Sequence, residues 1–347
     1  MPVITDMRNL IIMLILLFLI MLAMAYLRFV VIGNSPSYLQ SLDKKTSESE
    51  NNLQQRGNTI LNKQAMMDFA LTDDSDFEKM NPPNPGNWLA RFSEPGQTFD
   101  EYLKAKPLQP DKSRLVIVIQ PLGLFTDTEK ALMNKLKVFT NSFFQMAVEL
   151  KPEMTLSETT RYKRLRQGQG KTWLQYRTDY LREDVLEPNL PKNAFCYLGI
   201  TMADLYPDDK WNYVFGEASL KGRVGVYSLV RYFPAFWDES DTAENRIRTL
   251  RRSYSTLAHE TGHMFGLLHC IYYECLMCGS NNLDESDRRP LRLCPVCLKK
   301  LQWNIGFDTI KRYEELEEIY KTNGLASESD WITKRLGKIK LIGQSDK

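Results

Sequence analysis

The sequence predicts one α+β domain that follows an N-terminal apolar segment. Three observations support this fold class. Residues 10–27 are uniformly apolar, strand and helix patterns alternate from Trp88 onward, and a long helical pattern ends in a cluster holding all three histidines of the chain. The roughly 250 residues after Trp88 suffice for one sizeable core. We therefore expect a membrane segment at 1–32, a linker at 33–87 and the folded domain at 88–347.

The N-terminal segment has the length of a transmembrane helix. Leu10 to Leu27 is an unbroken run of 18 apolar residues. As a helix, Leu10 to Ile32 would extend over roughly 34 Å, enough to cross a bilayer. The alternative is a signal peptide cleaved after Ala23-Met24-Ala25, but apolar residues continue past that site. The pattern favours an uncleaved single-pass anchor over a signal peptide, and a buried core helix does not fit so uniform a terminal run.

Charges near this segment favour a cytoplasmic folded domain. Arg8 and the amino terminus precede the run, whereas Arg28, Lys44 and Lys45 follow it. No Asn-x-Ser/Thr sequon occurs in the chain, as expected for a domain kept out of the lumen. The polar residues 33–87 predict a largely disordered linker with a short helix near 58–71. A net charge of +2 does not indicate a nucleic-acid-binding surface, so no nucleic-acid partner is expected. We expect the protein to be a monomer.

Beyond Trp88, each predicted element follows from its apolar spacing. Alternating β-branched or continuous apolar runs predict strands, with Gly225 as a bulge or a site of close approach. Apolar residues three and four apart predict helices. The predicted strands are 114–120, 194–201, 211–215 and 224–232, and the predicted helices are 126–150, 241–257 and 308–320, within a helical C-terminal third.

The histidines lie in the run His259-Glu-Thr-Gly-His-Met-Phe-Gly-Leu-Leu-His269. On a helix, His259 and His263 share one face and can bind one zinc ion, while Glu260 reaches a metal-bound water. Gly266 allows the chain to turn back and deliver His269 as a third ligand. Three protein ligands leave one tetrahedral position for water, which is typical of catalytic rather than structural zinc. Glu260 is the predicted general base.

Five cysteines follow within the next 28 residues. Cys270, Cys275, Cys294 and Cys297 form two pairs with the spacing of a closed, structural four-cysteine zinc site. Two disulfides or a redox pair are the alternatives, although the chain is not a small secreted domain and no thioredoxin-like strand precedes Cys294-Pro-Val-Cys297. Cys278 is the predicted spare thiol, and Cys196, in an apolar strand, is predicted to be core.

At this point the sequence resembles a known family, the archaemetzincins, which are zinc metallopeptidases of the metzincin type. The runs HETGHMFGLLHC, YYECLM and LCPVC carry the resemblance, supported by residues 193–207, 211–216, 224–226 and 284–290, and it covers about Trp88 to Arg312. It implies a zincin-like domain with a mixed sheet, a long active-site helix, C-terminal helices and a cleft under an edge strand. It also implies two zinc ions per chain, in the ligand sets given above, and places Met277 in a turn beneath the catalytic zinc.

The sequence thus predicts a membrane-anchored zinc peptidase that hydrolyses peptide bonds of a peptide or protein substrate through a zinc-activated water. Two alternatives remain. One is a non-catalytic module in which both metals only shape a binding surface, although an intact Glu260 argues against it. The other is a zinc-dependent hydrolase of a non-peptide amide, which the motif alone does not separate from a peptidase.

Overall fold

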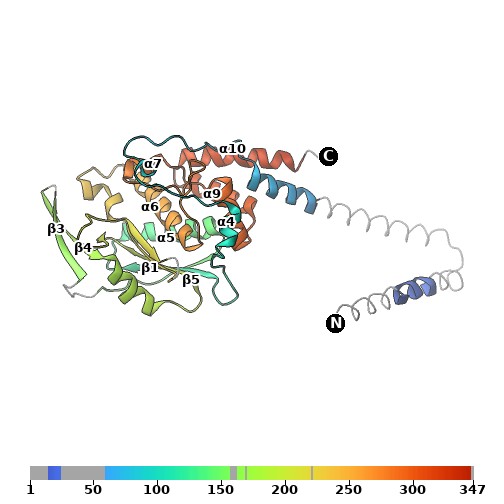
Figure 1. Cartoon of the computed structure of the whole chain (residues 1–347). Coiled ribbons are helices and arrows are strands. Elements are labelled where there is room, and N and C mark those ends of the chain that lie inside the picture. The colour runs from blue at the N-terminus through green and yellow to red at the C-terminus, as the bar shows by residue number, and fades with distance from the viewer. Residues whose placement is uncertain (1–14, 25–58, 157–161, 169, 220–221, 345–347) are drawn as a thin grey trace. The chain divides into compact units, whose positions relative to one another are not determined.

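The structure is a computed structural model that describes residues 15–24, 59–156, 162–168, 170–219 and 222–344. The chain divides into two compact units, residues 1–62 and 63–347. In the first unit, residues 15–24 form a helix whose apolar side chains are exposed. The second unit contains both candidate metal clusters, and Figure 1 labels its main elements.

The second unit is built on a mixed five-stranded sheet in the order β2-β1-β5-β8-β7. Strands β2, β1, β5 and β8 are parallel to one another, whereas the edge strand β7 is antiparallel to β8. A smaller sheet, β3-β4-β6, pairs β3 with β4 antiparallel and β4 with β6 parallel. The bounds are β1 Val116–Leu122, β2 Ala147–Leu150, β3 Lys163–Gly168, β4 Lys171–Arg177, β5 Ala194–Thr201, β6 Asp204–Tyr206, β7 Gly216–Ser219 and β8 Val224–Ser228.

Helices pack around this sheet. The α-helices are α3 Trp88–Arg91, α4 Phe99–Lys104, α5 Asp127–Phe144, α6 Ala243–Met264, α7 Leu283–Arg288, α8 Pro295–Ile305, α9 Thr309–Thr322 and α10 Ala326–Ile342, in addition to helix 59–72. A π-helix, η2 Tyr180–Leu186, and three short 3-10 helices complete the list: η3 Glu187–Asn189, η4 Val230–Tyr232 and η5 Pro234–Trp237.

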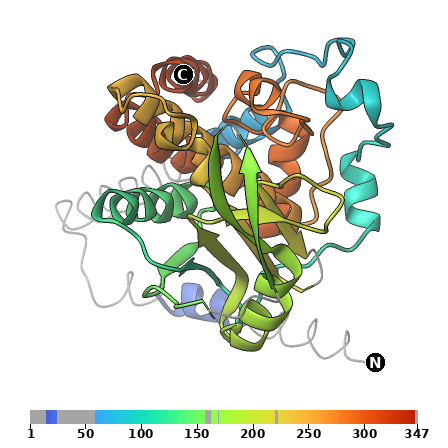
Figure 2. The same ribbon diagram turned by 90° about the vertical axis from the view of Figure 1, so that its left-hand side faces the viewer.

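The strand pleat divides the core into two. On β1, Ile117 and Ile119 belong to the larger cluster with α5 and α6, whereas Val118 points to the opposite face and packs near η2. Every residue of β5 is buried, because both faces of this central strand are covered. Figures 1 and 2 show α5 and α6 on one face of the sheet and the η2 segment on the other. The large cluster extends to the candidate metal residues, so the site rests on the main core.

Most predicted elements are confirmed, and the differences have local causes. The strand at 194–201 and the helices of α6 and α9 are confirmed, and the strand at 114–120 is shifted to 116–122. The predicted helix 126–150 is wrong at its end, because Gln145 adopts a left-handed conformation that terminates α5, and 147–150 then pairs as β2. The predicted strand 224–232 ends earlier, at Ser228, because the 3-10 helix η4 begins at Val230.

The predicted strand 211–215 is wrong. In this stretch only Val214 makes a bridge, to Leu205. The carbonyls of Trp211 and Asn212 instead accept hydrogen bonds from the Arg164 guanidinium, at 2.7 and 3.2 Å. Side chains from β3 and β4 therefore donate hydrogen bonds to the backbone carbonyls that a neighbouring strand would otherwise have bonded. The β3–β4 hairpin that supplies them has no counterpart in the sequence prediction.

The predicted linker contains an ordered segment that packs on the second unit. Helix 59–72 matches the short helix expected there, and Ala70 and Phe77 join the main core. The following strap, defined here as residues 73–98, contacts the cysteine-rich loop: Lys79 bridges Tyr273, and Glu274 N–H donates to the Glu78 carbonyl at 2.9 Å. Residues 63–87 of the predicted linker therefore belong to the second compact unit, whereas the predicted folded domain at 88–347 stays a prediction.

None of the described helices combines the length and apolar character that crossing a membrane requires. The helix at 15–24 covers part of the predicted transmembrane segment, and the rest of that segment lies outside the described residues. The membrane anchor thus stays a prediction.

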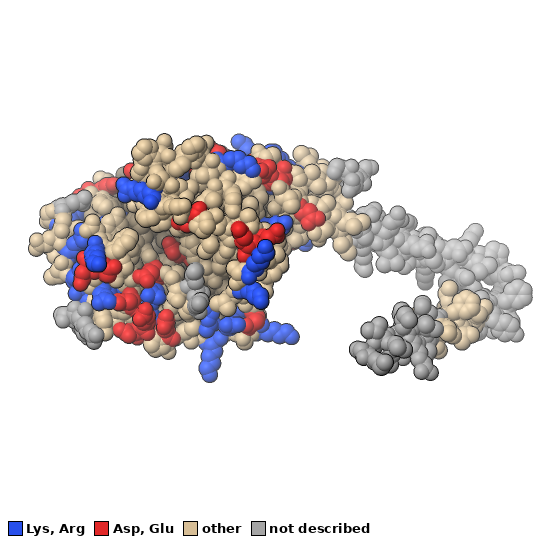
Figure 3. Space-filling view, in the orientation of Figure 1, with Lys and Arg blue, Asp and Glu red and all other residues tan. Residues whose placement is uncertain are grey.

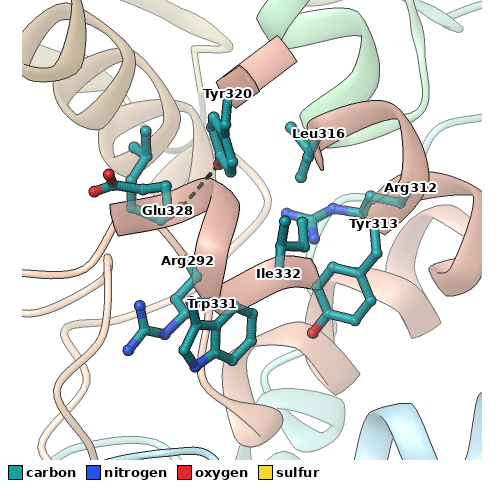
Figure 4. A pocket seen from close by; sticks show the side chains of 9 residues that line it. Arg292, Arg312, Tyr313, Leu316, Tyr320, Glu328, Trp331 and Ile332 are labelled. Carbon is teal, nitrogen blue, oxygen red and sulfur yellow. Dashed lines mark hydrogen bonds between the residues drawn. The ribbon is translucent and has the colours of Figure 1, made fainter. Parts of the chain in front are cut away.

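A small cavity lies between α9 and α10, away from the histidines, and Figure 4 shows its lining. Its volume is about 10 Å³, enough for about one water. The Tyr320 hydroxyl donates to the Leu291 carbonyl at its wall, 3.0 Å away, and the Arg312 Nε donates to the Phe143 carbonyl at 2.6 Å. This cavity is a gap in helix packing and not a substrate pocket. On the face shown in Figure 3, acidic and basic side chains are interspersed.

Arg335 tests whether the strap contributes to the stability of the second unit. Its fully buried guanidinium bonds to Asp73 at 2.5 Å and Asp76 at 3.0 Å, and to three backbone carbonyls of residues 69–73. Arg335→Ala removes these five hydrogen bonds and the buried cation that faces Asp73 and Asp76, and should lower the free energy of unfolding by about 3 kcal/mol in chemical denaturation. Lys338→Ala, which removes a half-exposed partner of Asp76, should cost under about 1 kcal/mol. Equal effects would contradict the role given to the strap.

Candidate metal centre

Helix α6 begins and ends where its sequence dictates. The Thr242 side chain caps its N-terminus by accepting from Asn245 N–H at 3.1 Å. At the other end, Gly266 has φ +82°. Gly266 N–H donates to the His263 carbonyl at 2.8 Å, and Leu267 N–H to the Gly262 carbonyl at 3.2 Å, which is a Schellman motif. A Cβ at residue 266 would lie 2.7 Å from Pro107, so both conformation and packing require glycine here.

The turn brings the three predicted histidines together. One ring nitrogen from each of His259, His263 and His269 lies within 4.8 Å of the others. Every Nδ1 donates to an acceptor: His259 to the Leu276 carbonyl at 2.8 Å, His263 to the Leu267 carbonyl at 2.6 Å and His269 to a carboxylate at 2.8 Å. Because Nδ1 carries the proton, each Nε2 has a free lone pair. Burial lowers the pKa of His259 well below its ordinary value, and that of His269 as well, which favours neutral imidazole ligands.

The carboxylate that holds His269 belongs to Glu94, a residue that sequence reasoning missed. Glu94 Oε1 also accepts from the Trp88 indole at 2.7 Å, and the Trp88 ring lies edge-on to His269 with centroids 5.4 Å apart. Burial works against ionisation of Glu94, but the bonds from His269 and Trp88 outweigh it and lower its pKa. No local pattern could reveal this contact, since 175 residues separate the partners.

Arg289 is a second residue without an assigned role in the sequence analysis. Its buried guanidinium donates to the Cys278 carbonyl and lies 3.5 Å from His259 Nδ1. Burial lowers its pKa, yet the guanidinium remains charged. Arg289 therefore places positive charge behind the histidine cluster and fixes the chain that passes beneath it.

Glu260 occupies the position expected of a general base. It lies on α6 between two histidines and is partly exposed. Burial raises the pKa of its carboxyl, an effect that His263 and Arg289 oppose. A carboxylate in these surroundings is more basic than one in water, which suits proton transfer.

The four predicted cysteines also converge. Cys270, Cys275, Cys294 and Cys297 are buried, and their sulfurs all lie within 4.8 Å of one another. Cys275 Sγ accepts from Cys294 N–H at 3.2 Å and from Met277 N–H at 3.5 Å, as thiolate ligands commonly do. Cys278 lies outside this group, and its thiol donates to the Tyr273 carbonyl at 3.3 Å. Cys196 is fully buried in the core, and burial raises its pKa.

Met277 lies directly beneath the histidine helix. It is fully buried, and a Cβ on Gly262 would come within 2.7 Å of its sulfur. The Met277 carbonyl accepts from Cys270 N–H at 2.9 Å. The methionine turn therefore joins α6 to the cysteine loop through one short segment.

Both donor sets fit zinc. Tetrahedral zinc with nitrogen ligands at 2.0–2.1 Å separates them by about 3.3 Å, and sulfur ligands at 2.3 Å by about 3.8 Å. The Nε2 atoms of His259 and His263 are 3.1 Å apart, and the sulfurs of Cys270 and Cys294 are 3.7 Å apart. Both separations are close to those expected for two ligands of one tetrahedral zinc ion. The sulfur separation is far beyond that of a disulfide, near 2.05 Å, and all six cysteines are free.

The helix with two histidines, the glycine turn that returns a third and the methionine next to the helix together form a site of the metzincin type. The model of peptidase family M54 matches residues 172–303. Archaemetzincin-2 of Rattus norvegicus is 35% identical over 267 residues, covering 69% of this chain and 74% of the relative. The Homo sapiens archaemetzincin-2 is also 35% identical, over 73% of this chain and 77% of its own length. The chain therefore belongs to the archaemetzincin family.

More distant relatives include archaemetzincin-1 of Homo sapiens, 31% identical over 66% of this chain and 51% of the relative. Among solved structures, archaemetzincin from Archaeoglobus fulgidus, complexed with malonate, is 28% identical. It covers 53% of this chain and 99% of its own, with a TM-score of 0.39. Archaemetzincin from Methanopyrus kandleri is 27% identical over 57% of this chain and 98% of its own, with a TM-score of 0.43.

The cysteine assignment predicts a difference between two neighbouring thiols. Cys294→Ser removes one donor from the closed set, so zinc retained against a competing chelator should fall from two ions per chain to about one. Cys278→Ser, the matched control, removes a thiol that donates to the Tyr273 carbonyl and lies outside the four convergent sulfurs, so this variant should retain two. Metal analysis by mass spectrometry measures both. Loss in the Cys278 variant alone would show that the wrong four cysteines have been chosen.

Proposed function

We propose that this protein is a zinc-dependent metallopeptidase that hydrolyses peptide bonds with Glu260 as its general base. One observation carries the proposal: three imidazoles converge, two of them flank Glu260 on α6, and no fourth protein ligand joins them among the described residues. Zinc in that set would lower the pKa of a bound water to about 7 and polarise a carbonyl. The family membership supports the same reaction class.

In this proposal, the residues around the histidines have two roles, proton transfer and orientation of the metal ligands. Glu260 takes the proton of the attacking water and delivers it to the leaving amine. The His259 and His263 side chains are fixed by carbonyls of the surrounding chain, and His269 by Glu94. The exposed antiparallel edge of β7, next to α6, offers backbone groups along which an extended peptide could pair.

The four-cysteine set has a structural role in this proposal. A closed set of four thiolates leaves no open position for a substrate. Because Cys270 directly follows His269, zinc held there would fix the peptide that aims the third histidine. A purely non-catalytic module and a hydrolase of a non-peptide amide are the competing functions, and peptide cleavage with product identification separates them from a peptidase.

Replacement of Glu260 tests the reaction directly. Glu260→Gln keeps the shape of the side chain but cannot accept the proton, so peptide turnover should fall at least about 10²–10⁴-fold. Metal analysis should still give two zinc ions per chain, because Glu260 is not a ligand. A variant that retains near-wild-type turnover would show that the base is misassigned and would favour the binding module.

We also propose that residues 1–32 anchor the protein in a membrane as a single-pass segment, with the folded domain on the cytoplasmic side. The support is the apolar run from Leu10 to Leu27 and the charges that flank it. A peptide or protein substrate, no nucleic-acid partner and a monomeric state complete the proposal. The anchor is separable from the chemistry, because both donor sets lie in the unit 63–347.

The anchor predicts how two forms of the protein partition. The full chain should remain in the membrane fraction after carbonate extraction. A chain that begins at Lys63 should be soluble and should retain peptide turnover within about twofold, since it keeps the strap and both metal sets. Recovery of a mature, soluble protein beginning at Tyr26 would support a cleaved signal peptide instead.

A further inference from the structure

We infer that Glu94 is a positioning residue for the catalytic zinc, delivered to His269 by the N-terminal strap. This inference rests on the proposed zinc chemistry but adds a determinant outside residues 172–303, the part matched by the family model. Glu94 accepts the Nδ1 proton of His269 at 2.8 Å, and among the described residues it is the only carboxylate that bonds one of the three imidazoles.

His269 needs such support more than the other two histidines do. His259 and His263 belong to α6, where the helix restricts their rotamers. His269 follows Leu268 in irregular backbone. A carboxylate that accepts from the outer nitrogen of an imidazole fixes the tautomer and the ring orientation, and increases the basicity of the ligating nitrogen. Glu94 is therefore placed to aim His269 and to strengthen its bond to a metal.

The strap holds Glu94 in place from both sides. On one side, Trp88 N–H donates to Glu285 at 2.8 Å, and the Trp88 indole lies against Gly279, where a Cβ would come within 2.5 Å of it. On the other side, the Gln97 side chain bonds the Gly266 carbonyl and Leu268 N–H, each at 3.3 Å.

These bonds fix the backbone around Glu94 independently of its own side chain. Among the described residues, the Glu94 carboxylate accepts hydrogen bonds from His269 and Trp88. Removing the carboxylate should consequently change His269 more than it changes the fold.

Zinc affinity of the full chain, measured by chelator competition, tests the inference without requiring catalysis. Glu94→Ala should weaken zinc binding at the histidine set about 10–100-fold. Glu94→Gln keeps an acceptor but removes the charge, so its affinity should lie between those of Glu94→Ala and wild type. Cobalt(II) substitution identifies the site affected, because only the cysteine set gives thiolate-to-metal charge-transfer absorption, and that absorption should be unchanged.

Asp74→Asn is the matched control. Asp74 lies on the same strap but bonds Lys79 and Tyr273 rather than a histidine, so this variant should bind zinc as the wild type does. Unchanged affinity of Glu94→Ala at the histidine set would overturn the inference. Equal losses in the Glu94 and Asp74 variants, at both metal sets, would overturn it in favour of a general structural role. A wild-type chain that binds zinc only through cysteines would instead overturn the proposed function, and this inference with it.

Discussion

The reversal of the chain at Gly266 is the constraint on which the candidate metal centre depends. A helix alone can present His259 and His263 on one face, but it carries every later residue away from them. The left-handed conformation at Gly266 ends α6 and sends the chain back within three residues. The Tyr102 hydroxyl and the Gln97 side chain then satisfy the carbonyls of Phe265 and Gly266 that the helix leaves open. The turn is thus specified by its own glycine and by packing from distant segments.

A short loop, residues 269–277, connects the turn to the cysteine set and packs back against α6. His269 and Cys270 are adjacent, Cys270 N–H donates to the Met277 carbonyl, and Met277 packs against Gly262 on the histidine helix. The loop therefore closes on α6, with one donor set on each side of it. This arrangement explains why a closed cysteine site lies next to an open histidine site. Irregular backbone has few restraints of its own, and a structural metal supplies them where regular secondary structure does not.

The sequence predicts the parts of this protein whose cause is local. The histidine spacing, the glycine turn and the cysteine pairs each follow from short patterns, and the structure brings those residues together as two sets. Strand 194–201 was predictable because a central parallel strand is apolar on both faces. The missed features have nonlocal causes: Arg164 satisfies the backbone near Trp211, and Glu94 reaches His269 across 175 residues. Residues 63–87 have the polar composition of a linker, so the sequence predicts one. The residues that tie this segment to the fold, such as Phe77 and Asp73, have their partners near the C-terminus, where no local pattern reveals them.

The strap contacts both the C-terminal helices and the residues of the candidate metal centre. Arg335, near the C-terminus, holds Asp73 and Asp76, while Tyr273 of the cysteine loop bonds Asp74 and Lys79. Farther along the same segment, Trp88 and Glu94 reach His269. One continuous stretch thus connects the C-terminal helices, the cysteine loop and the third histidine. Because a ligand displaced by about 1 Å can reduce turnover on the order of 10²-fold, contacts this far from the histidines would affect the proposed catalysis. A unit that began at the first predicted strand would lack Glu94, the carboxylate that bonds His269 and that we propose positions this ligand.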